Sequence, residues 1–332
     1  MEVKISVVIL SYNLEKYIEE CLNSVINQTI FKKLQVVCID DGSTDRTKEI
    51  IKKYTQKYSN IVLKEMKGQE IGIGGLRQIG INMAIGKYLA YIDGDDYIDK
   101  YFFEKMYKKI EEEESDIVSC DYYRIEKVKN VYCSSLDKNV VGEIDLSKRK
   151  KLILKSGPLW NKLYKLEIIK RNNLKFLEKY AFEDNYFVPI YLMYCKKISQ
   201  IFEPLYYYRT TNQSSITRKK DNLKFFDRIK TSEELFKKLK EIDKNNFEEK
   251  MQEEIEYRFL ELYLFNTYSK AVKFKKYPKI YLKEIKEGVK KYTPNYFRNK
   301  YYIENFSGRK KIKLRLICRY PYFFHLYYNL FH

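Results

Sequence analysis

The first hundred residues alternate between short apolar runs and segments whose apolar side chains recur at helical spacing. Apolar runs at residues 4–10, 34–39, 61–63 and 88–92 predict four buried strands. Residues 14–27 place their apolar side chains on one face of a predicted helix, and further helices are expected after the second run and, from a glycine-rich start, after the third. This alternation predicts an α/β fold, a mostly parallel sheet with helices on both faces.

The pattern becomes less regular after about residue 122. Short strands, a loop around residues 156–158, a helix over about 184–195 and a late strand over 198–209 are expected there. From about residue 219 the chain is rich in lysine at helical spacing and almost lacks glycine, which predicts a separate helical region ending near residue 300. We therefore expect three parts: an α/β domain at 1–215, a helical region at 216–305 and a basic, aromatic tail at 306–332.

Composition limits the chemistry available to the chain. Its 332 residues suffice for about two domains, and 45% hydrophobic residues can build a core. The only histidines are His325 and His332, so the body of the chain cannot hold a Ser-His-Asp relay, an HExxH zinc site or a Cys-His pair. The six cysteines form no CxxC pair, which is typical of reduced cysteines in a cytoplasmic protein. Catalysis must use carboxylates, lysines, tyrosines or a bound metal.

The net charge of +19 favours an anionic partner. Nucleic acid, an anionic membrane surface and a phosphorylated substrate all fit that description. The apolar run at residues 5–10 is too short for a signal peptide, and no window reaches about 18 uninterrupted apolar residues. We therefore expect neither an export signal nor a transmembrane helix.

Acidic residues follow two of the predicted strands. Asp40 and Asp41 end the second strand. Four acids fall within seven residues at the end of the fourth: Asp93, Asp95, Asp96 and Asp99. Ligands of open parallel sheets bind at the carboxyl ends of strands, so both clusters should face one crevice. Carboxylates this close repel one another unless a cation lies among them, and hard oxygen ligands favour Mg²⁺ or Mn²⁺. The alternative is a solvated acidic turn that caps the helix beginning near Lys100.

Four motifs occur in the order and spacing of a known family. They are SVVILSYN at residues 6–13, SVINQT at 24–29, IDDGSTD at 39–45 and DGDD at 93–96. In these motifs the chain resembles the family 2 glycosyltransferases over roughly residues 4–210. The resemblance implies the GT-A fold, which is Rossmann-like, and an inverting transfer of a sugar from a nucleotide diphosphate donor, with a divalent metal, Mn²⁺ or Mg²⁺, on the diphosphate.

The resemblance also implies roles for residues that match the family's motifs. On the donor nucleotide, Asp41 corresponds to the acid that hydrogen-bonds the base, and the turn of Ser11 and Tyr12 to the wall beneath it. Arg77 lies where the family commonly has Ala-Arg-Asn and is expected at the donor phosphates, although Gln78 replaces the usual asparagine there. For the metal, the resemblance implies Asp95 as the metal-binding acid, with Asp93 nearer the ribose and metal and Asp96 in support.

Inverting transfer needs a general base for the attacking hydroxyl, on the opposite side of the anomeric carbon from the leaving group. Residues 182–185 resemble the family's Glu-Asp base motif, with Asp184 as the candidate and Glu183 as the fallback. Asp184 could instead be an acid favoured by the helix dipole at the start of a helix. Trp160 and Lys162 lie in a Trp-Asn-Lys segment that resembles one bordering the acceptor site, where Glu183 is also placed; the tryptophan could equally belong to the core.

The tail combines basic and aromatic residues. No acid follows Glu304, and aromatic and aliphatic residues near helical spacing follow six Lys and Arg residues at 309–319. This predicts an interfacial segment that holds the protein on an anionic membrane surface. The alternatives are a terminal helix packed on the protein's own body and a contact between subunits.

Together these features predict an enzyme of surface-polysaccharide synthesis, peripheral on the inner face of the cell membrane. It would move one sugar, with UDP-sugar as the default donor, to a hydroxyl of a glycan or lipid-linked acceptor; the absence of a QxxRW-like motif argues against a processive polymerase. A sugar-phosphate nucleotidyltransferase should carry a glycine-rich loop where residues 11–13 stand. A nucleic-acid-binding protein would explain the charge but not the acids at two strand ends, so no nucleic-acid partner is expected. The oligomeric state stays open.

Overall fold

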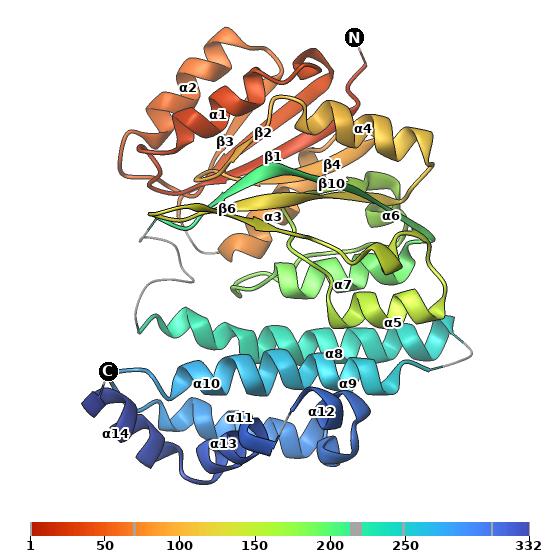
Figure 1. The fold of residues 1–332 in the computed structure, drawn as a ribbon. Coiled ribbons are helices and arrows are strands. Elements are labelled where there is room, and N and C mark those ends of the chain that lie inside the picture. Colours follow the sequence, from red (N-terminus) through yellow and green to blue (C-terminus); the bar gives the residue numbers. More distant parts are fainter. Residues whose placement is uncertain (1, 69–70, 213–220, 248–249, 307, 332) are drawn as a thin grey trace. The chain divides into compact units, whose positions relative to one another are not determined.

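The computed structural model describes residues 2–68, 71–212, 221–247, 250–306 and 308–331 (Figure 1). The chain divides into two compact units. The first comprises Met1–Lys179 and Phe187–Gln213, and the second Tyr180–Tyr186 and Ser214–His332. The short segment Tyr180–Tyr186, which carries the candidate base, therefore groups with the helical unit, although the sequence analysis placed it in the α/β domain.

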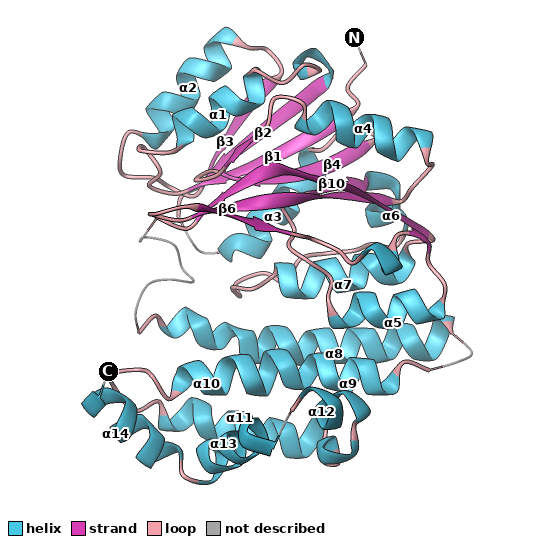
Figure 2. Cartoon of the chain, viewed as in Figure 1, coloured by secondary structure: helices cyan, strands magenta, loops and turns pink. Residues whose placement is uncertain are grey.

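A ten-stranded sheet, counted over the described residues, forms the centre of the first unit (Figure 2). Its strands are β1 (Ile5–Ser11), β2 (Leu34–Asp40), β3 (Ile61–Glu65), β4 (Tyr88–Asp93), β5 (Tyr97–Ile98), β6 (Ile117–Ile125), β7 (Asn130–Cys133), β8 (Gly142–Glu143), β9 (Lys162–Lys165) and β10 (Lys197–Arg209). The order along the sheet is β3-β2-β1-β4-β9-β6-β10-β5, with β7 beside β6 and β8 beside β10. The four predicted early strands and the late strand are confirmed.

The sheet is mixed but mainly parallel. Strand β1 pairs in parallel with β2 and β4, β2 with β3, and β6 with β10. Strand β9 lies antiparallel between β4 and β6. The first four strands are therefore a parallel set whose carboxyl ends share one edge.

Helices cover both faces of this sheet, as predicted. They are α1 (Ile18–Ile26), α2 (Thr47–Lys57), α3 (Gly72–Met83), α4 (Phe102–Glu112), α5 (Leu146–Leu154) and α6 (Leu166–Arg171), with 3₁₀ turns at Phe31–Lys33 and Lys138–Val140; α7 (Asp184–Tyr194) begins in the second unit and continues in the first. On one face α1, α2 and α4 share a core with alternate residues of β1 such as Val7 and Ile9. On the other, α3 approaches β1 closely, because a Cβ added at Gly80 would lie 2.5 Å from Val8.

The second unit is helical over its described residues. It contains a 3₁₀ turn at Leu223–Phe226, α8 (Asp227–Asn246), α9 (Gln252–Phe259), a π-helical segment at Leu260–Asn266, α10 (Thr267–Ala271), α11 (Lys279–Tyr292), a 3₁₀ turn at Tyr296–Arg298, α12 (Lys300–Asn305), α13 (Gly308–Arg319) and α14 (Pro321–Phe331). It has its own core, rich in Phe and Tyr. Helices therefore continue beyond residue 305 into the tail, whose aromatic and aliphatic residues were expected near helical spacing. Among the described residues, we find no helix long and apolar enough to cross a membrane.

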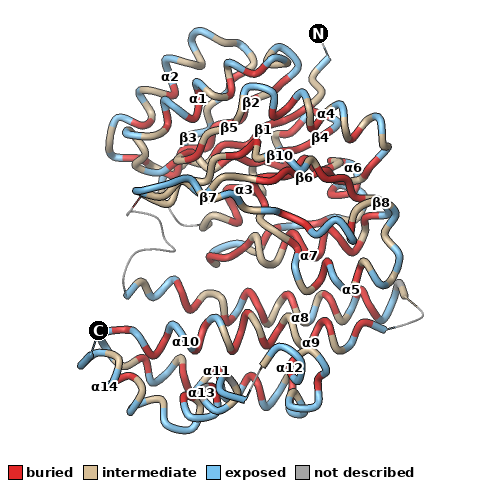
Figure 3. Tube along the Cα trace, viewed as in Figure 1, coloured by how far each residue is buried: buried red, intermediate tan, exposed pale blue. Residues whose placement is uncertain are grey.

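Burial along the chain follows this division (Figure 3). In the first unit, the buried residues concentrate in the strands and on the inner sides of the helices, with Val7, Val37 and Ala90 inaccessible to solvent. In the second, Leu260, Tyr263 and Tyr268 are equally inaccessible. Each unit thus has an apolar interior of its own.

Candidate functional site

The register of three strands brings both acidic clusters to one edge of the sheet. Ser11 at the end of β1 pairs with Asp40 at the end of β2, and Leu10 pairs with Asp93 at the end of β4. The backbone N–H of Asp41 donates to the carbonyl of Ser11 at 2.9 Å, so the chain beyond β2 stays beside β1. The two predicted clusters therefore adjoin, as expected for the ligand edge of a parallel sheet.

Asp40 organises the turn that presents Asp41. The Asp40 side chain is completely buried and accepts hydrogen bonds from the Ser43 N–H at 2.8 Å, the Ser43 hydroxyl at 2.5 Å and the Ser11 hydroxyl at 3.1 Å. Gly42 has φ of +77°, and a Cβ there would lie 2.9 Å from the backbone N of Gly68. The turn thus requires glycine. Ser11, predicted at the donor nucleotide, uses its hydroxyl on Asp40, while Asp41 beside it is 7% exposed.

The loops after β1 and β2 are joined by hydrogen bonds. The N–H of Asn13 donates to the Ser43 hydroxyl at 2.9 Å, and the Asn13 side-chain oxygen accepts from the Thr44 N–H at 2.8 Å. Asn13 has φ of +51°, which asparagine tolerates better than most residues. Tyr12 projects from this braced pair of loops and is 44% exposed. The region where the resemblance places the nucleotide base is therefore a preorganised surface.

Asp93 and Arg77 form an ion pair at the end of β4. An Arg77 terminal nitrogen lies 3.0 Å from Asp93 Oδ1, with the arginine side chain 7% and the aspartate 30% exposed. The Arg77 guanidinium also lies 5.3 Å from the centre of the Tyr91 ring. Arg77, which was expected at the donor phosphates, thus orients Asp93, which was expected near the donor ribose and the metal. Because the guanidinium is almost buried, this pair is screened less by water and salt than a surface ion pair.

The Asp96 carboxylate turns into the protein. It is completely buried, and it accepts hydrogen bonds from the Tyr206 hydroxyl at 2.8 Å and from the Arg209 N–H at 2.7 Å. Burial, together with the nearby carboxylates of Asp95 and Asp93, raises the pKa of Asp96 well above its usual range. The Tyr206 hydroxyl also accepts from the Asp93 N–H at 3.2 Å. We call residues 93–96 the acidic turn. Asp96 supports this turn from the protein interior, through its hydrogen bonds to β10.

Asp95 is likewise held by residues at the end of β10 and just beyond it. Its Oδ2 accepts a hydrogen bond from the Asn212 side-chain amide at 2.9 Å, and its backbone carbonyl accepts from Arg209 Nε at 2.9 Å. Arg209 also pairs with Glu20 of α1 at 2.6 Å. Tyr206, Arg209 and Asn212 were missed by the sequence analysis. The available signal was the polar, tyrosine-rich end of the predicted late strand, which nothing in the sequence connects to the acidic turn.

The acidic turn suits a divalent ion that is coordinated both by the protein's carboxylates and by the phosphates of a ligand. Among the described residues, no group of three or more His, Cys, Asp or Glu side chains is arranged to hold a metal by itself. Mg²⁺ sites commonly use one or two carboxylates together with substrate phosphates and waters. With Asp96 engaged inward, Asp93 and Asp95 supply that smaller carboxylate set. The residues therefore fit Mg²⁺ or Mn²⁺ bound together with a diphosphate.

The candidate base lies in the helical unit. Asp184 begins α7, its Oδ1 accepts from the Asn185 N–H at 2.8 Å, and Glu183 beside it is 4% exposed. The preceding residues are fixed to α8, because the Ala181 N–H donates to Asp227 at 3.0 Å and the Ala181 carbonyl accepts from the Thr231 hydroxyl at 3.0 Å. These bonds determine where the chain enters α7.

Arg228 of α8 is the basic residue associated with this segment. Its guanidinium lies 4.0 Å from the centre of the Phe182 ring, and Phe182 itself has a left-handed backbone with φ of +65°. Burial lowers the pKa of Arg228 to about 10, and the Asp184 carboxylate opposes that shift. Asp184 is thus one of two acids, the other being Glu261, whose charge acts on Arg228, and the sequence analysis did not identify this arginine.

The predicted acceptor segment is mostly interior. Trp160 is 9% exposed and belongs to the core of the first unit, stacked on Tyr206 at 4.2 Å and on Tyr208 at 5.1 Å between ring centres. Lys162 is completely buried, and its Nζ donates to the carbonyl of Pro158 at 2.5 Å. Trp160 therefore occupies a core position, which was one of the two possibilities left open by the sequence. A place for Trp160 at the border of an acceptor site stays a prediction.

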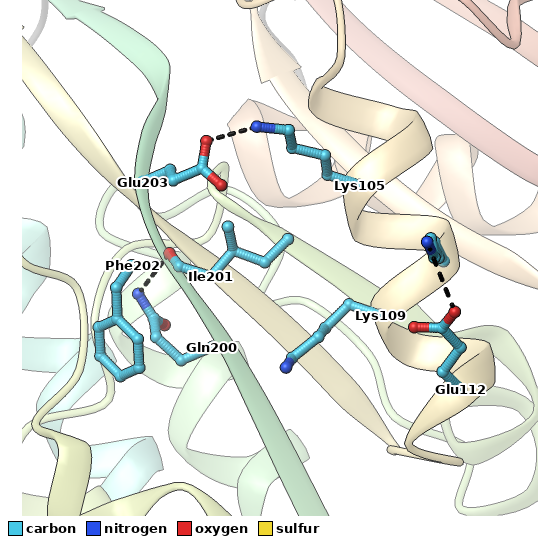
Figure 4. Close-up of a pocket in the computed structure, with 8 residues that line it drawn as sticks. Lys105, Lys109, Glu112, Gln200, Ile201, Phe202 and Glu203 are labelled. Atoms are coloured by element: carbon cyan, nitrogen blue, oxygen red, sulfur yellow. Dashed lines mark hydrogen bonds and ion pairs between the residues drawn. The ribbon is translucent and has the colours of Figure 1, made fainter.

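A surface hollow of about 390 Å³ lies between α4 and β10 in the first unit (Figure 4). Its lining includes three lysines of α4, but Lys105 pairs with Glu203, Lys108 lies 3.7 Å from Glu112, and Lys109 lies 2.5 Å from Glu113 just outside the lining. None of the predicted site residues lines it. Because the positive charge is matched locally, we assign no ligand to this hollow.

The sequence of this chain matches a known family and several curated bacterial proteins. Residues 6–172 match the family model described as Glycosyl transferase family 2. Among curated relatives, the uncharacterized glycosyltransferase EpsJ of Bacillus subtilis is 30% identical over 220 residues, and a poly(ribitol-phosphate) beta-glucosyltransferase of Bacillus spizizenii is 35% identical over 211 residues. These matches cover 64% and 62% of this chain, but only 62% and 32% of the relatives, less than two thirds of either.

Solved structures resemble this chain over most of its length. Staphylococcus aureus TarS 1-349 in complex with UDP-GlcNAc superposes with a TM-score of 0.69 at 22% identity, covering 87% of this chain and 82% of that one. A mannosyltransferase of Pyrobaculum calidifontis, in complex with GDP-Man and Mn²⁺, gives a TM-score of 0.54 at 14% identity, covering 97% and 88%. At these identities the likeness concerns the fold, and it confirms the predicted GT-A architecture.

Proposed function

The chain belongs to glycosyl transferase family 2, and we propose that it is an inverting glycosyltransferase that moves one sugar from a nucleotide diphosphate donor to a hydroxyl. The observation that carries this proposal is the shared edge of β1, β2 and β4. There Asp41, Asp93 and Asp95 stand on hydrogen-bonded turns that are braced from within the first unit. UDP is the proposed nucleotide, because a structural neighbour was solved with UDP-GlcNAc.

In this proposal, different residues of the shared edge bind different parts of the donor. Asp41 and Tyr12 hold the base, while Asp93, oriented by Arg77, reaches the ribose. Asp95 holds Mn²⁺ or Mg²⁺, and Asp96 keeps the turn in place. When bound, the ion would neutralise the charge that develops on the leaving diphosphate. Fixed carboxylates suit this task, because they need no reorganisation as the glycosidic bond breaks.

The acceptor hydroxyl must lose its proton as it attacks, and Asp184 is the proposed base. Support comes from its place at the start of α7, on a segment fixed by hydrogen bonds to α8. Glu183 is the fallback, although its side chain is 4% exposed and thus less accessible to a substrate hydroxyl. Trp160, Lys162 and Glu183 would border the acceptor.

The proposed acceptor is a glycan or a lipid-linked glycan in the synthesis of a bacterial surface polymer. The names of the relatives support this class, because one acts on poly(ribitol-phosphate). The proposed place of work is the inner face of the cell membrane, with the C-terminal helices in contact with anionic lipid.

A panel of nucleotide sugars, assayed for Mn²⁺-dependent binding and for slow donor hydrolysis, tests the proposal. We expect Asp95→Ala to lose metal-dependent donor binding and activity. We expect Asp184→Ala to keep donor binding and lose transfer to an acceptor. Glu49→Ala, at an exposed acid of α2, is the matched control and should behave as wild type. Wild-type activity in either Asp variant would reject the role proposed for that residue.

A further inference from the structure

The two C-terminal helices pack on the second unit through one side only. On α13, the carbonyl of Ile317 accepts from the Tyr268 hydroxyl at 3.3 Å. On α14, His325 Nδ1 lies 3.1 Å from the carbonyl of Val272, and the Asn329 amide donates to the carbonyl of Phe274 at 3.2 Å. Ile317 and His325 are each 6% exposed. The tail is therefore docked on its own unit, and its orientation is set by these contacts.

The other side of α14 is an apolar stripe. Phe323, Leu326, Tyr327 and Leu330 are 69%, 39%, 59% and 75% exposed, and their spacing of three, one and three residues places them on one helical face. Figure 3 colours much of α14 as exposed. Side chains of this size are rarely presented together to water by a soluble monomer, so the stripe indicates a binding surface.

The exposed side of α13 adds positive charge. Arg309, Arg315 and Arg319 are exposed there, and Ile312 and Leu316 between them are 59% and 41% exposed. No acid occurs after Glu304, so nothing in the tail's sequence neutralises these arginines. We call this side of α13 together with the α14 stripe the outward face. A surface that is both apolar and cationic is complementary to an anionic lipid headgroup layer over hydrocarbon.

We propose that the outward face binds an anionic phospholipid bilayer, with α13 and α14 lying in the plane of the interface. The proposal deepens the proposed function and rests on it, because it brings the enzyme to the surface where a lipid-linked acceptor is found. The stripe enters the acyl boundary, and the arginines remain among the headgroups. Each Arg near such a surface strengthens binding about fivefold, and each buried large apolar side chain about tenfold.

The test uses the full chain and vesicles of phosphatidylcholine with and without phosphatidylglycerol, measured by co-sedimentation. Wild type should bind the anionic vesicles and bind the neutral ones much more weakly. Phe323→Ser combined with Leu330→Ser should weaken binding to anionic vesicles about a hundredfold. The matched control combines Ile280→Ser with Phe297→Ser, which are 73% and 51% exposed elsewhere in the unit, and should bind as wild type.

A second pair of variants separates charge from apolar contact. Arg315→Gln with Arg319→Gln should weaken binding to anionic vesicles about 25-fold and leave the weak binding to neutral vesicles unchanged. Lys279→Gln with Lys290→Gln, two exposed lysines of α11, removes the same charge elsewhere and should have a smaller effect.

Three results would overturn the proposal. They are failure of wild type to bind anionic vesicles, equal loss in the control variants, and a lipid-free dimer that the Phe323→Ser, Leu330→Ser variant dissociates, which would make the outward face a contact between copies. Donor hydrolysis without vesicles should be unchanged in every tail variant. If the wild type binds vesicles but does not hydrolyse any donor nucleotide sugar, that result counts against the proposed function instead.

Discussion

Removing the Tyr206 hydroxyl tests how the acidic turn is supported. In the wild type, this hydroxyl donates to the buried Asp96 carboxylate at 2.8 Å and accepts from the Asp93 N–H at 3.2 Å. Tyr206→Phe deletes both hydrogen bonds but keeps the ring that stacks on Trp160 at 4.2 Å. The substitution therefore isolates the polar contribution from the packing.

The expected cost follows from the chemistry of the two bonds. Removing the donor leaves the buried Asp96 carboxyl short of a partner, which costs about 1–3 kcal/mol, and the lost bond to the backbone N–H costs about 0.5–1.5 kcal/mol. We expect Tyr206→Phe to lower the free energy of unfolding of the first unit by roughly 2–4 kcal/mol. Because Asp93 loses a support, metal-dependent binding of the donor nucleotide should weaken as well.

Urea unfolding followed by tryptophan fluorescence is the appropriate assay. Trp160 is the only tryptophan of the chain, so the signal reports on the first unit without interference from the helical unit. Tyr101→Phe is the matched control: Tyr101 is 40% exposed, and its loss of a hydroxyl should cost less than about 0.5 kcal/mol. A change in Tyr206→Phe no larger than in Tyr101→Phe would show that the Tyr206 hydroxyl does not support the acidic turn.

Three further predictions concern stability. Gly80→Ala, whose Cβ would lie 2.5 Å from Val8, should cost about 1–3 kcal/mol in urea unfolding, whereas Gly308→Ala, with nothing within 4 Å, should cost nothing measurable. Burial raises the pKa of Tyr122 to about 12, so the unfolded chain, which titrates near 10, releases that proton first. Its contribution to stability is complete below about pH 10 and is lost as the pH rises towards about 12, by less than the full ~1.4 kcal/mol per pH unit because the side chain is only partly buried; equal stability at pH 9 and 11 would contradict this. Lys162→Met, at a buried lysine bonded to a backbone carbonyl, should lower stability by about 1–3 kcal/mol, and a change confined to the Michaelis constant for the acceptor would contradict the core position of Lys162.

The parallel half of the fold was predictable because its signals are local. Each of β1 to β4 is a short apolar run, and the acids that follow β2 and β4 adjoin because the carboxyl ends of parallel strands share an edge. The less regular half was not. Helices α5 and α6 and the mixed pairing of β9 have no comparable periodic signature, and their positions depend on packing against the sheet.

The support of the acidic turn could not be predicted for a related reason. Tyr206 lies 110 residues from Asp96, and Asn212 lies 117 residues from Asp95. Their contacts depend on β10 entering the sheet beside β6, which brings its polar end to the turn. Sequence spacing likewise could not tell that Asp40 turns inward onto Ser43. Side-chain direction is decided by tertiary hydrogen bonds rather than by local pattern.

Hydrogen–deuterium exchange with UDP and Mn²⁺ tests most directly the claim that the donor nucleotide binds at the shared edge of β1, β2 and β4. We expect slower amide exchange on ligand addition in peptides that cover residues 11–14, 40–47 and 93–97, and no such change in Asp95→Ala. Binding of UDP that leaves these three segments unchanged, or that slows exchange only within the helical unit, would contradict it.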